Sequence, residues 1–282
     1  MTRRPPTFFI IGAQKAGTTS LHHYLRGHPQ IAMSEPKEPN YFSTAHDPAG
    51  WDDYLAGFPG AADAVAIGEA STTYTMYPHV SGVPERLLAR VPDARLIYLV
   101  RNPIERMRSA YRHALAWGSE TRPITAALRA DPRYLDVSRY AGQLDQWLSR
   151  VDRDRVLLLS LDQLQADPAA VVRRVLAFVG VDADWRPADL HVAFNPSAAK
   201  RAPRAGWRWL GERLIRSGRT DRVPGAIVRL NDRRPPLLTR PIRPDELTVP
   251  EALREELLAA LRDDLRQLAA LMAPAAPAWT AH

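Results

Sequence analysis

Short runs of apolar residues recur through the first 180 residues, and most are followed by a stretch with apolar side chains at helical spacing. The runs Phe8–Ile11, Ala94–Val100 and Arg155–Leu161 lack the polar alternation of half-exposed strands, which is typical of strands buried on both faces. Val65–Glu69 is a fourth candidate strand. Strand, turn and helix in repetition predict an α/β fold, with a central parallel β-sheet flanked by helices.

The helical stretches have apolar residues on one face. Thr18–Arg26, Pro103–Trp117 and Pro168–Val179 each follow a predicted strand or its turn. Near the C-terminus, Pro250–Met272 carries leucines at helical spacing and predicts a long amphipathic helix.

The region between these parts has a different composition. Residues 193–231 are rich in arginine, glycine and tryptophan, with one helix expected at Trp207–Ile215, and residues 233–250 are proline-dense and predict loops. Since no long flexible linker interrupts the chain, we expect one domain over residues 1–282. Its core spans about 7–200 and a helical C-terminal extension spans about 201–282.

The first predicted strand runs into the sequence GAQKAGTT at residues 12–19. Its two glycines allow backbone amides to converge on an anion, and the following helix N-terminus attracts negative charge. Lys15 adds a full positive charge, and Thr18, Thr19 and Ser20 add hydroxyl donors. Thr18 stands where the triphosphate loop G-x-x-x-x-G-K-[ST] has lysine, so a plain NTP site is disfavoured. A tight turn with a solvated lysine is the alternative.

A second anion site is predicted at the end of the strand Ala94–Val100. Arg101 follows it directly, and Asn102 and Pro103 suit the start of a helix. Because ligands of open α/β sheets bind at this edge, Arg101 should reach the edge that holds the glycine loop. Ser109, about two turns into the helix, could join it in holding a second phosphate. The alternative is a surface arginine paired with Glu105.

A candidate general base lies in SEPKEPNYFS, residues 34–43. Pro36 and Pro39 favour extended backbone, and Tyr41 and Phe42 form an apolar anchor beside Glu38. A carboxylate held beside aromatic groups can have a raised pKa, which suits a general base. A rigid loop with solvated acids is the alternative.

These three segments, in this order, resemble the sulfotransferases that use 3′-phosphoadenosine 5′-phosphosulfate (PAPS). QKAGTTSL is similar to that family's 5′-phosphosulfate loop, and LIYLVRNPIERMRSAYRHAL to its 3′-phosphate segment, with Arg101 and Ser109 at the binding positions. KEPNYF resembles the E-x-H-F-F element of the heparan-sulfate-type branch, in which the glutamate is the catalytic base, here Glu38. RYAGQLDQWL and the segment from VLLLSLDQL onward fit the later pattern, so the resemblance covers about residues 7–200.

The resemblance implies a sulfotransferase with PAPS as sulfuryl donor, adenosine 3′,5′-bisphosphate (PAP) as product and no metal. The acceptor would be a hydroxyl or amine of a sugar, lipid or small natural product. Glu38 and Lys15 would be catalytic. The donor-binding residues would be Lys15, Ala16, Gly17, Thr18, Thr19, Ser20, Arg101, Ser109, Lys200 and Arg201.

Two positions depart from the heparan-sulfate-type pattern. Asn40 stands where that branch has histidine, and Ala70, in GEASTTY, stands where it has a lysine at the reaction centre. Both departures favour a different acceptor. If Glu38 is not the base, the substitutes are His22, His23, His46 and Glu69.

Composition narrows the alternatives only modestly. The net charge of +7 and the pI near 10.0 favour anionic partners of any kind. The absence of cysteine excludes disulfides and thiolate metal sites. No run approaches the ~20 apolar residues of a membrane span, and no secretory signal is evident, so we expect a cytoplasmic protein.

Two rival functions stay open. A P-loop kinase or NTPase would use Asp162, which follows an apolar run, to hold magnesium. A nucleic-acid-binding protein would fit the charge, but no recognised binding motif supports it, and we expect no nucleic-acid partner. The sequence does not indicate an oligomeric state.

Overall fold

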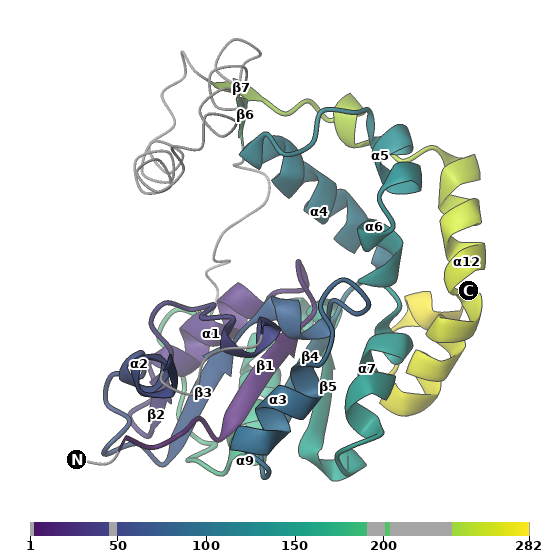
Figure 1. Cartoon of the computed structure of the whole chain (residues 1–282). Helices are drawn as coiled ribbons and strands as arrows, with labels where there is room; N and C mark the ends of the chain where they lie inside the picture. The colour runs from purple at the N-terminus through teal and green to yellow at the C-terminus, as the bar shows by residue number, and fades with distance from the viewer. Residues whose placement is uncertain (1–2, 45–49, 191–200, 204–238, 282) are drawn as a thin grey trace. The chain divides into compact units, whose positions relative to one another are not determined.

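The computed structural model describes residues 3–44, 50–190, 201–203 and 239–281, and it confirms the α/β class with a parallel sheet (Figure 1). The strands are β1 (Phe8–Gly12), β2 (Ile31–Met33), β3 (Ala66–Ala70), β4 (Arg95–Val100), β5 (Val156–Ser160), β6 (Arg201–Pro203) and β7 (Thr239–Pro241). The helices are α1 (Thr18–Arg26), α2 (Gly50–Ala56), α3 (Val83–Arg90), α4 (Pro103–Trp117), α5 (Ile124–Ala130), α6 (Arg133–Asp136), α7 (Tyr140–Leu148), α8 (Leu161–Ala166), α9 (Pro168–Val179) and α12 (Glu251–Met272).

The chain forms two compact units. The first unit comprises Met1–Arg106, Arg133–Asn195 and Leu257–His282, and the second comprises Met107–Pro132 and Pro196–Glu256. Helices α4 and α12 each contain residues of both units. The expectation of a single domain over the whole chain stays a prediction.

The first unit is built on a five-stranded parallel sheet in the order β2-β3-β1-β4-β5. Strand β1 lies between β3 and β4, and every one of its residues is buried. This central position explains the continuous apolar run FFII, because a strand covered on both faces has no exposed side.

Helices cover both faces of this sheet. Helix α1 carries the chain from β1 outward to β2, whereas α3 carries it from β3 across to β4 in the opposite direction. Since parallel crossovers are right-handed, the two helices lie on opposite faces, as Figure 1 shows. Helix α9 packs against α1.

The strand order creates a switch point beside β1. The chain leaves β1 toward β3 and β2, while β4 and β5 extend the sheet on the other side. Ligands of such sheets bind at the carboxyl ends of the strands where the order reverses. The carboxyl ends of β1 and β4 are therefore the expected ligand edge, and they carry the glycine loop and Arg101.

The predicted helix bounds are confirmed for α1, α4 and α9, and capping explains two of them. Asn102 Oδ1 accepts hydrogen bonds from the amides of Ile104 and Glu105 at 3.1 and 3.2 Å, so Asn102 is the N-cap of α4. Helix α9 begins where the Asp167 side chain accepts from the Ala170 amide at 2.9 Å. These bonds satisfy amides that the first helical turn leaves without partners.

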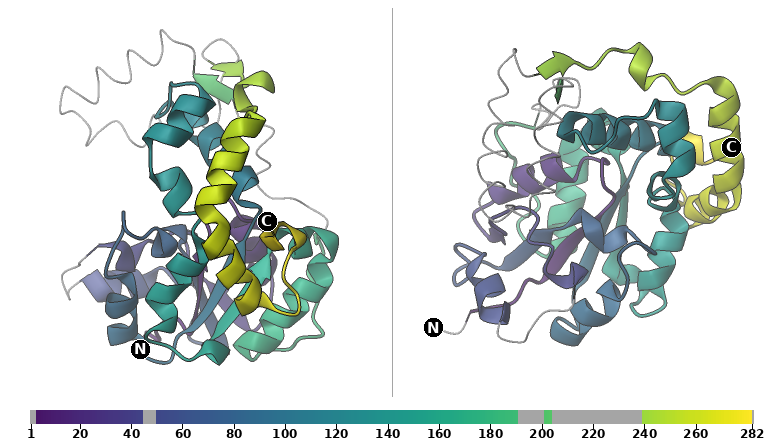
Figure 2. Two further views of the ribbon diagram at one scale, coloured as in Figure 1. Left: turned by 90° about the vertical axis from the view of Figure 1, so that its right-hand side faces the viewer. Right: turned by 45° about the horizontal axis from the view of Figure 1, so that its top comes forward.

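The C-terminal helix is confirmed as α12, starting one residue later than predicted. Within the first unit it lies beside α7, where Asp264 accepts hydrogen bonds from the amides of Gly142 and Ala141 at 2.8 and 3.2 Å (Figure 2). Its buried leucines line one face: Leu253, Leu257, Leu261, Leu265 and Leu268.

The helix predicted at Trp207–Ile215 lies outside the described residues. Among the helices that the structure describes, none is long and apolar enough to cross a membrane. In the second unit, β6 and β7 pair antiparallel, with Ala202 opposite Arg240.

Candidate functional site

The turn between β1 and α1 has the backbone of an anion-binding loop. Lys15 has φ 71° and Gly17 has φ 95°, and left-handed residues of this kind occur in loops whose backbone amides bind anions. A side chain at Gly17 would approach Leu161 Cδ1 to 2.8 Å, and one at Gly12 would approach Thr75 Oγ1 to 2.0 Å. Both glycines are therefore required by close packing as well as by conformation.

The N-terminus of α1 opens directly from this loop. Among the described residues no side chain caps it, and no acidic residue stands in its first turn. Thr18 is buried, whereas Thr19 and Ser20 are half-buried. The first amides of a nine-residue helix and three hydroxyl groups thus lie at one place beside Lys15, which suits a phosphate or sulfate group.

Arg101 is in direct contact with this loop. Its Nη1 donates a hydrogen bond to the Lys15 carbonyl oxygen at 3.2 Å. Its Nη2 lies 3.7 Å from Glu105 Oε2, so the ion pair considered as an alternative also forms. The Arg101 carbonyl accepts from Tyr140 OH at 2.7 Å, which fixes the chain where β4 ends. The structure therefore brings the two predicted anion-binding segments together.

Three further residues were predicted to bind the donor: Ser109, Lys200 and Arg201. Ser109 is a half-buried residue of α4 and belongs to the second unit. Arg201, also in the second unit, donates to Thr239 Oγ1 at 2.9 Å and to the Thr239 carbonyl at 3.2 Å. Lys200 lies outside the described residues. The roles of these three in donor binding stay predictions.

Glu38 is held by polar neighbours. Lys37 Nζ donates to Glu38 Oε1 at 2.6 Å, and Thr72 Oγ1 lies at 3.4 Å from Glu38 Oε2. Tyr41, a residue of the predicted aromatic anchor, stacks its ring on Tyr54 with centroids 4.4 Å apart. The sequence analysis predicted an aromatic environment for the carboxylate, but an ammonium and a hydroxyl contact it directly.

Asn40 fastens the Glu38 segment to the 3₁₀ turn η2 (Thr72–Thr75) and to the residue before it. The Asn40 amide donates to Ser71 Oγ at 3.0 Å, and Asn40 Oδ1 accepts from Thr73 Oγ1 at 2.7 Å. Its backbone has φ 54°, a conformation that asparagine adopts more readily than most residues. Asn40 therefore has a structural explanation at the position where the resemblance expects histidine.

The same turn reaches the glycine loop. Thr75 Oγ1 donates to the Ile11 carbonyl at 2.8 Å, one residue before Gly12. Because η2 touches Glu38 through Thr72 at one end and β1 through Thr75 at the other, it holds the candidate base and the anion loop at one edge of the sheet. The sequence analysis singled out GEASTTY only for Ala70 and did not predict that the hydroxyl residues after Ala70 form this turn.

Glu69, a substitute base, is fully buried at the end of β3. Its carboxylate accepts from Ser71 Oγ at 2.6 Å and from Tyr54 OH. Burial raises the pKa of Glu69 above its usual range. Since Ser71 also accepts from Asn40, Glu69 supports the loop that carries Glu38.

The histidine substitutes differ in setting. His22 is buried on α1, and its Nε2 lies 3.4 Å from the Ser34 carbonyl. His23 is more exposed, with Nε2 at 2.8 Å from Asp189 Oδ2. His46 lies outside the described residues.

Acid should destabilise the protein through His22. Burial, and next the positive charge of Lys37, lower the pKa of His22 from 6.5 to about 4. Between these values the unfolded chain binds a proton that the folded chain does not, so stability is lost as the pH falls through this range. From pH 7 to 5 we expect a loss of about 2 kcal/mol in the free energy of unfolding.

Urea unfolding at both pH values measures this loss. His22→Gln should show about 2 kcal/mol less acid destabilisation than the wild type. Equal acid sensitivity in wild type and His22→Gln would contradict the assignment.

Asp162, the candidate magnesium ligand of the NTPase alternative, lies near the N-terminus of α8. Its Oδ2 accepts the indole N–H of Trp279 at 2.5 Å. Across the described ranges, no group of three histidine, aspartate or glutamate side chains is arranged to hold a metal ion. The NTPase alternative therefore gains no support from this aspartate.

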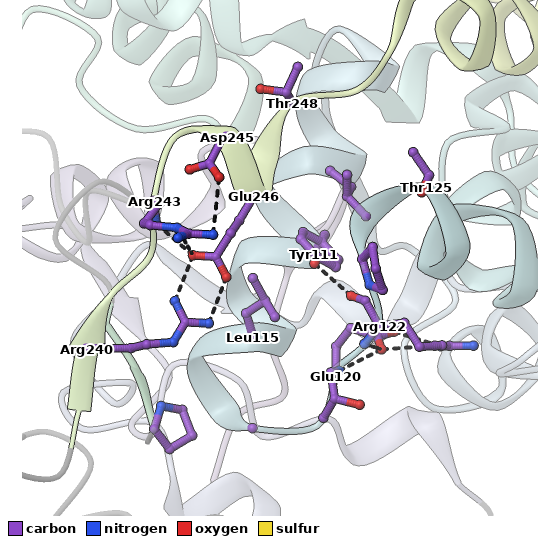
Figure 3. Close-up of a pocket in the computed structure, with 15 residues that line it drawn as sticks. Tyr111, Leu115, Glu120, Arg122, Thr125, Arg240, Arg243, Asp245, Glu246 and Thr248 are labelled. Atoms are coloured by element: carbon purple, nitrogen blue, oxygen red, sulfur yellow. Dashed lines mark hydrogen bonds and ion pairs between the residues drawn. The ribbon is translucent and has the colours of Figure 1, made fainter. Parts of the chain in front are cut away.

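A separate cavity of about 440 Å³ lies within the second unit (Figure 3). Its charged lining forms pairs: Arg240 binds both oxygens of Glu246 at 2.7 Å, and Arg122 binds Glu120 at 2.7 Å. Hydrogen bonds from Arg122 lower the pKa of Glu120 to about 2. Tyr111 from α4 completes one wall. The sequence analysis did not predict this cavity, because its lining comes from two segments that are far apart in the sequence, residues 111–125 and 203–248.

Comparisons with known proteins agree with this geometry. The family model described as "Sulfotransferase domain" matches residues 5–197. Human heparan sulfate glucosamine 3-O-sulfotransferase 6 is 31% identical over 244 residues, covering 80% of this chain and 68% of that protein. Human bifunctional heparan sulfate N-deacetylase/N-sulfotransferase 2 is 30% identical over 199 residues, covering 63% of this chain. The chain spans only 22% of the length of that bifunctional protein.

A solved structure extends the likeness to nearly the whole chain. The crystal structure of a sulfotransferase from Alicyclobacillus acidocaldarius superposes with a TM-score of 0.65 at 27% sequence identity. The match covers 95% of this chain and 96% of that one.

Proposed function

The chain belongs to the sulfotransferase domain family, and on that premise we propose that it transfers the sulfuryl group of PAPS to a hydroxyl or amine of a sugar, lipid or small natural product. PAPS is the donor substrate and PAP the product. The names of the relatives make a heparan-sulfate-type sugar the first acceptor to test, whereas Ala70 and Asn40 depart from that branch and favour testing other acceptors beside it.

The contact between Arg101 and the Lys15 carbonyl carries this proposal. PAPS bears a phosphosulfate and a separate phosphate on one ribose, so it needs two cationic subsites that are close but distinct. A guanidinium has five N–H donors in a planar fork, which lets Arg101 hold the loop and bind a phosphate together. The contact supports one site with two anion-binding halves.

The loop residues fit the 5′ half of the donor. The Lys15 ammonium, the α1 amides and the hydroxyls of Thr18, Thr19 and Ser20 are all donors, as a phosphosulfate requires. Arg101 would hold the 3′ phosphate, with Ser109, Lys200 and Arg201 as further donor-binding residues. A metal is not needed to explain this donor set.

Glu38 would act as the general base. Its carboxylate takes the proton of the acceptor hydroxyl or amine, and the acceptor atom forms its new bond to sulfur. The bond between sulfur and the bridging phosphate oxygen breaks, and the electron pair stays on that oxygen. Lys15 and the loop amides then stabilise charge where it develops, which is usually the largest catalytic contribution.

Donor turnover tests the proposal without knowledge of the acceptor. Excess enzyme is incubated with PAPS in three samples, which contain no added acceptor, heparan sulfate oligosaccharides or a metabolite extract. The PAP formed in each sample is measured by chromatography. Mass spectrometry of the acceptor samples then searches for a sulfate increment. PAP, but not Mg·ATP, should raise the melting temperature. Stabilisation by Mg·ATP alone, with no PAP formed, would favour the NTPase alternative instead.

Arg101→Ala should weaken PAP binding selectively. Loss of a charge-assisted contact to the 3′ phosphate predicts about a 10- to 100-fold lower affinity for PAP. Affinity for adenosine 5′-monophosphate, measured by calorimetry, should stay within about threefold. Arg95→Ala, at the opposite end of β4, is the control, because Arg95 binds the Phe178 carbonyl there. Equal losses for both nucleotides would overturn the assignment.

A further inference from the structure

Lysine is rare in this chain, although basic residues are abundant. Of the 38 lysine and arginine residues only three are lysines, at positions 15, 37 and 200. Lys15 and Lys200 both belong to segments proposed for donor binding. Lysine differs from arginine in being a compact point charge on a flexible stem, so the two are not interchangeable at a reacting group. Lys37 therefore requires an explanation.

Lys37 lies against the proposed base. Its Nζ is 2.6 Å from Glu38 Oε1, and its side chain is 20% exposed whereas that of Glu38 is 37% exposed. The backbone around it is fixed, since Ser34 Oγ donates to the Lys37 carbonyl at 3.0 Å. In an ordinary surface ion pair both side chains extend into water. The Lys37–Glu38 pair differs, because its lysine is more buried than its acid.

The charge of Lys37 also reaches helix α1. After burial, it is the largest cause that lowers the pKa of His22, which lies one helical turn beyond Thr18 of the anion loop. The ammonium thus contacts the Glu38 carboxylate, and its charge acts on the helix that begins at the loop. Ala70, at the buried end of β3, contributes only a methyl group to this edge.

We propose that Lys37 is a second catalytic cation, which contacts the sulfuryl group during its transfer. The inference rests on the proposed function of the Glu38 and Lys15 site. In the resting site Lys37 neutralises Glu38. When Glu38 takes the acceptor proton, this pair loses its negative partner while one unit of negative charge develops on the leaving phosphate. The flexible stem of Lys37 lets the ammonium follow that charge through the sulfuryl oxygens, and no proton leaves Lys37.

Donor binding gives a test that does not depend on turnover. Only PAPS carries the sulfuryl group, so calorimetry on Lys37→Ala should show PAPS affinity falling about tenfold relative to PAP affinity. Arg26→Ala is the matched control. Arg26, at the end of α1, forms an exposed ion pair with Glu35, which lies two residues before Lys37. Its replacement removes a cation near the same turn and should leave the affinities for PAPS and PAP unchanged.

Turnover supplies the second arm. Lys37→Ala and the isosteric Lys37→Met should each form PAP about 100-fold more slowly. Ethylammonium chloride should accelerate Lys37→Ala, but neither Lys37→Met nor the wild type, since only the alanine variant leaves room for an amine. Thermal melting checks that each variant is folded. Lys37→Met should stay folded because methionine keeps the volume of the side chain.

The outcomes separate the two proposals. If the wild type neither binds PAP nor converts PAPS, the proposed function fails. If the wild type does both, while the Lys37 variants keep its PAPS-to-PAP affinity ratio and its rate, the role of Lys37 is overturned. The role of Lys37 is also overturned if its variants are slower but keep the wild-type PAPS-to-PAP affinity ratio and are not rescued by the amine. Such a loss of rate would be structural only.

Discussion

Lys15→Ala is expected to lower donor turnover by about 100-fold or more, the range found when a charge-stabilising donor is removed from an active site. The proposed reaction places a full new negative charge on the bridging phosphate oxygen, and Lys15 is the lysine within the loop that would hold it. Affinity for PAP should fall less than the rate does, because the α1 amides, Arg101 and the hydroxyl residues still bind the product.

The backbone of the loop should survive this substitution. Lysine and alanine meet the same steric cost at φ 71°, since both carry a Cβ atom. The Arg101 hydrogen bond goes to the carbonyl of residue 15 and not to its side chain. The loss therefore reports the ammonium group itself.

Single-turnover conversion of PAPS to PAP measures the effect. Lys15→Arg keeps the charge but changes its shape, so it should recover only part of the rate. Gln14→Ala, in the same turn, is the matched control and should stay near the wild type. A Lys15→Ala rate within threefold of the wild type would refute the role of Lys15.

The sequence predicted the sheet and its main helices because those elements depend on local patterns. Apolar runs marked β1, β4 and β5, and Asn102 with Pro103 marked the start of α4. Strand β2, with three residues, is too short to show a period, and it forms because Ile31–Met33 pairs with β3. Its formation depends on tertiary pairing that periodicity does not report.

The sequence predicted only those parts of the site that belong to recognisable motifs. The glycine loop and Arg101 have recognisable neighbours, and the structure brings them into contact. The Lys37–Glu38 pair was missed because adjacent side chains meet only when the turn between Ser34 and Asn40 aligns them. The support from η2 was missed because it depends on hydroxyl groups some 30 residues away in sequence.

Glu38→Gln is the second substitution with a large expected effect. Glutamine keeps the shape of the side chain and can still accept from Thr72, but it cannot take a proton at neutral pH. If Glu38 is the general base, donor turnover with an added acceptor should fall by about 100-fold or more, while PAP affinity stays unchanged. Glu35→Gln is the control, because that exposed acid lies three residues earlier and pairs with Arg26.

A Glu38→Gln variant with near-wild-type turnover would move the base elsewhere, and the geometry then ranks the substitutes. Glu69 is fully buried and both its oxygens already accept hydrogen bonds, so it cannot meet an acceptor without rearrangement of β3. His22 is buried with Nε2 toward the Ser34 carbonyl. His23, whose ring is 41% exposed beside Asp189, would be the next residue to replace. Because its partner is an acid, His23→Gln would then be expected to remove the remaining turnover, whereas Glu69→Gln would mainly lower stability.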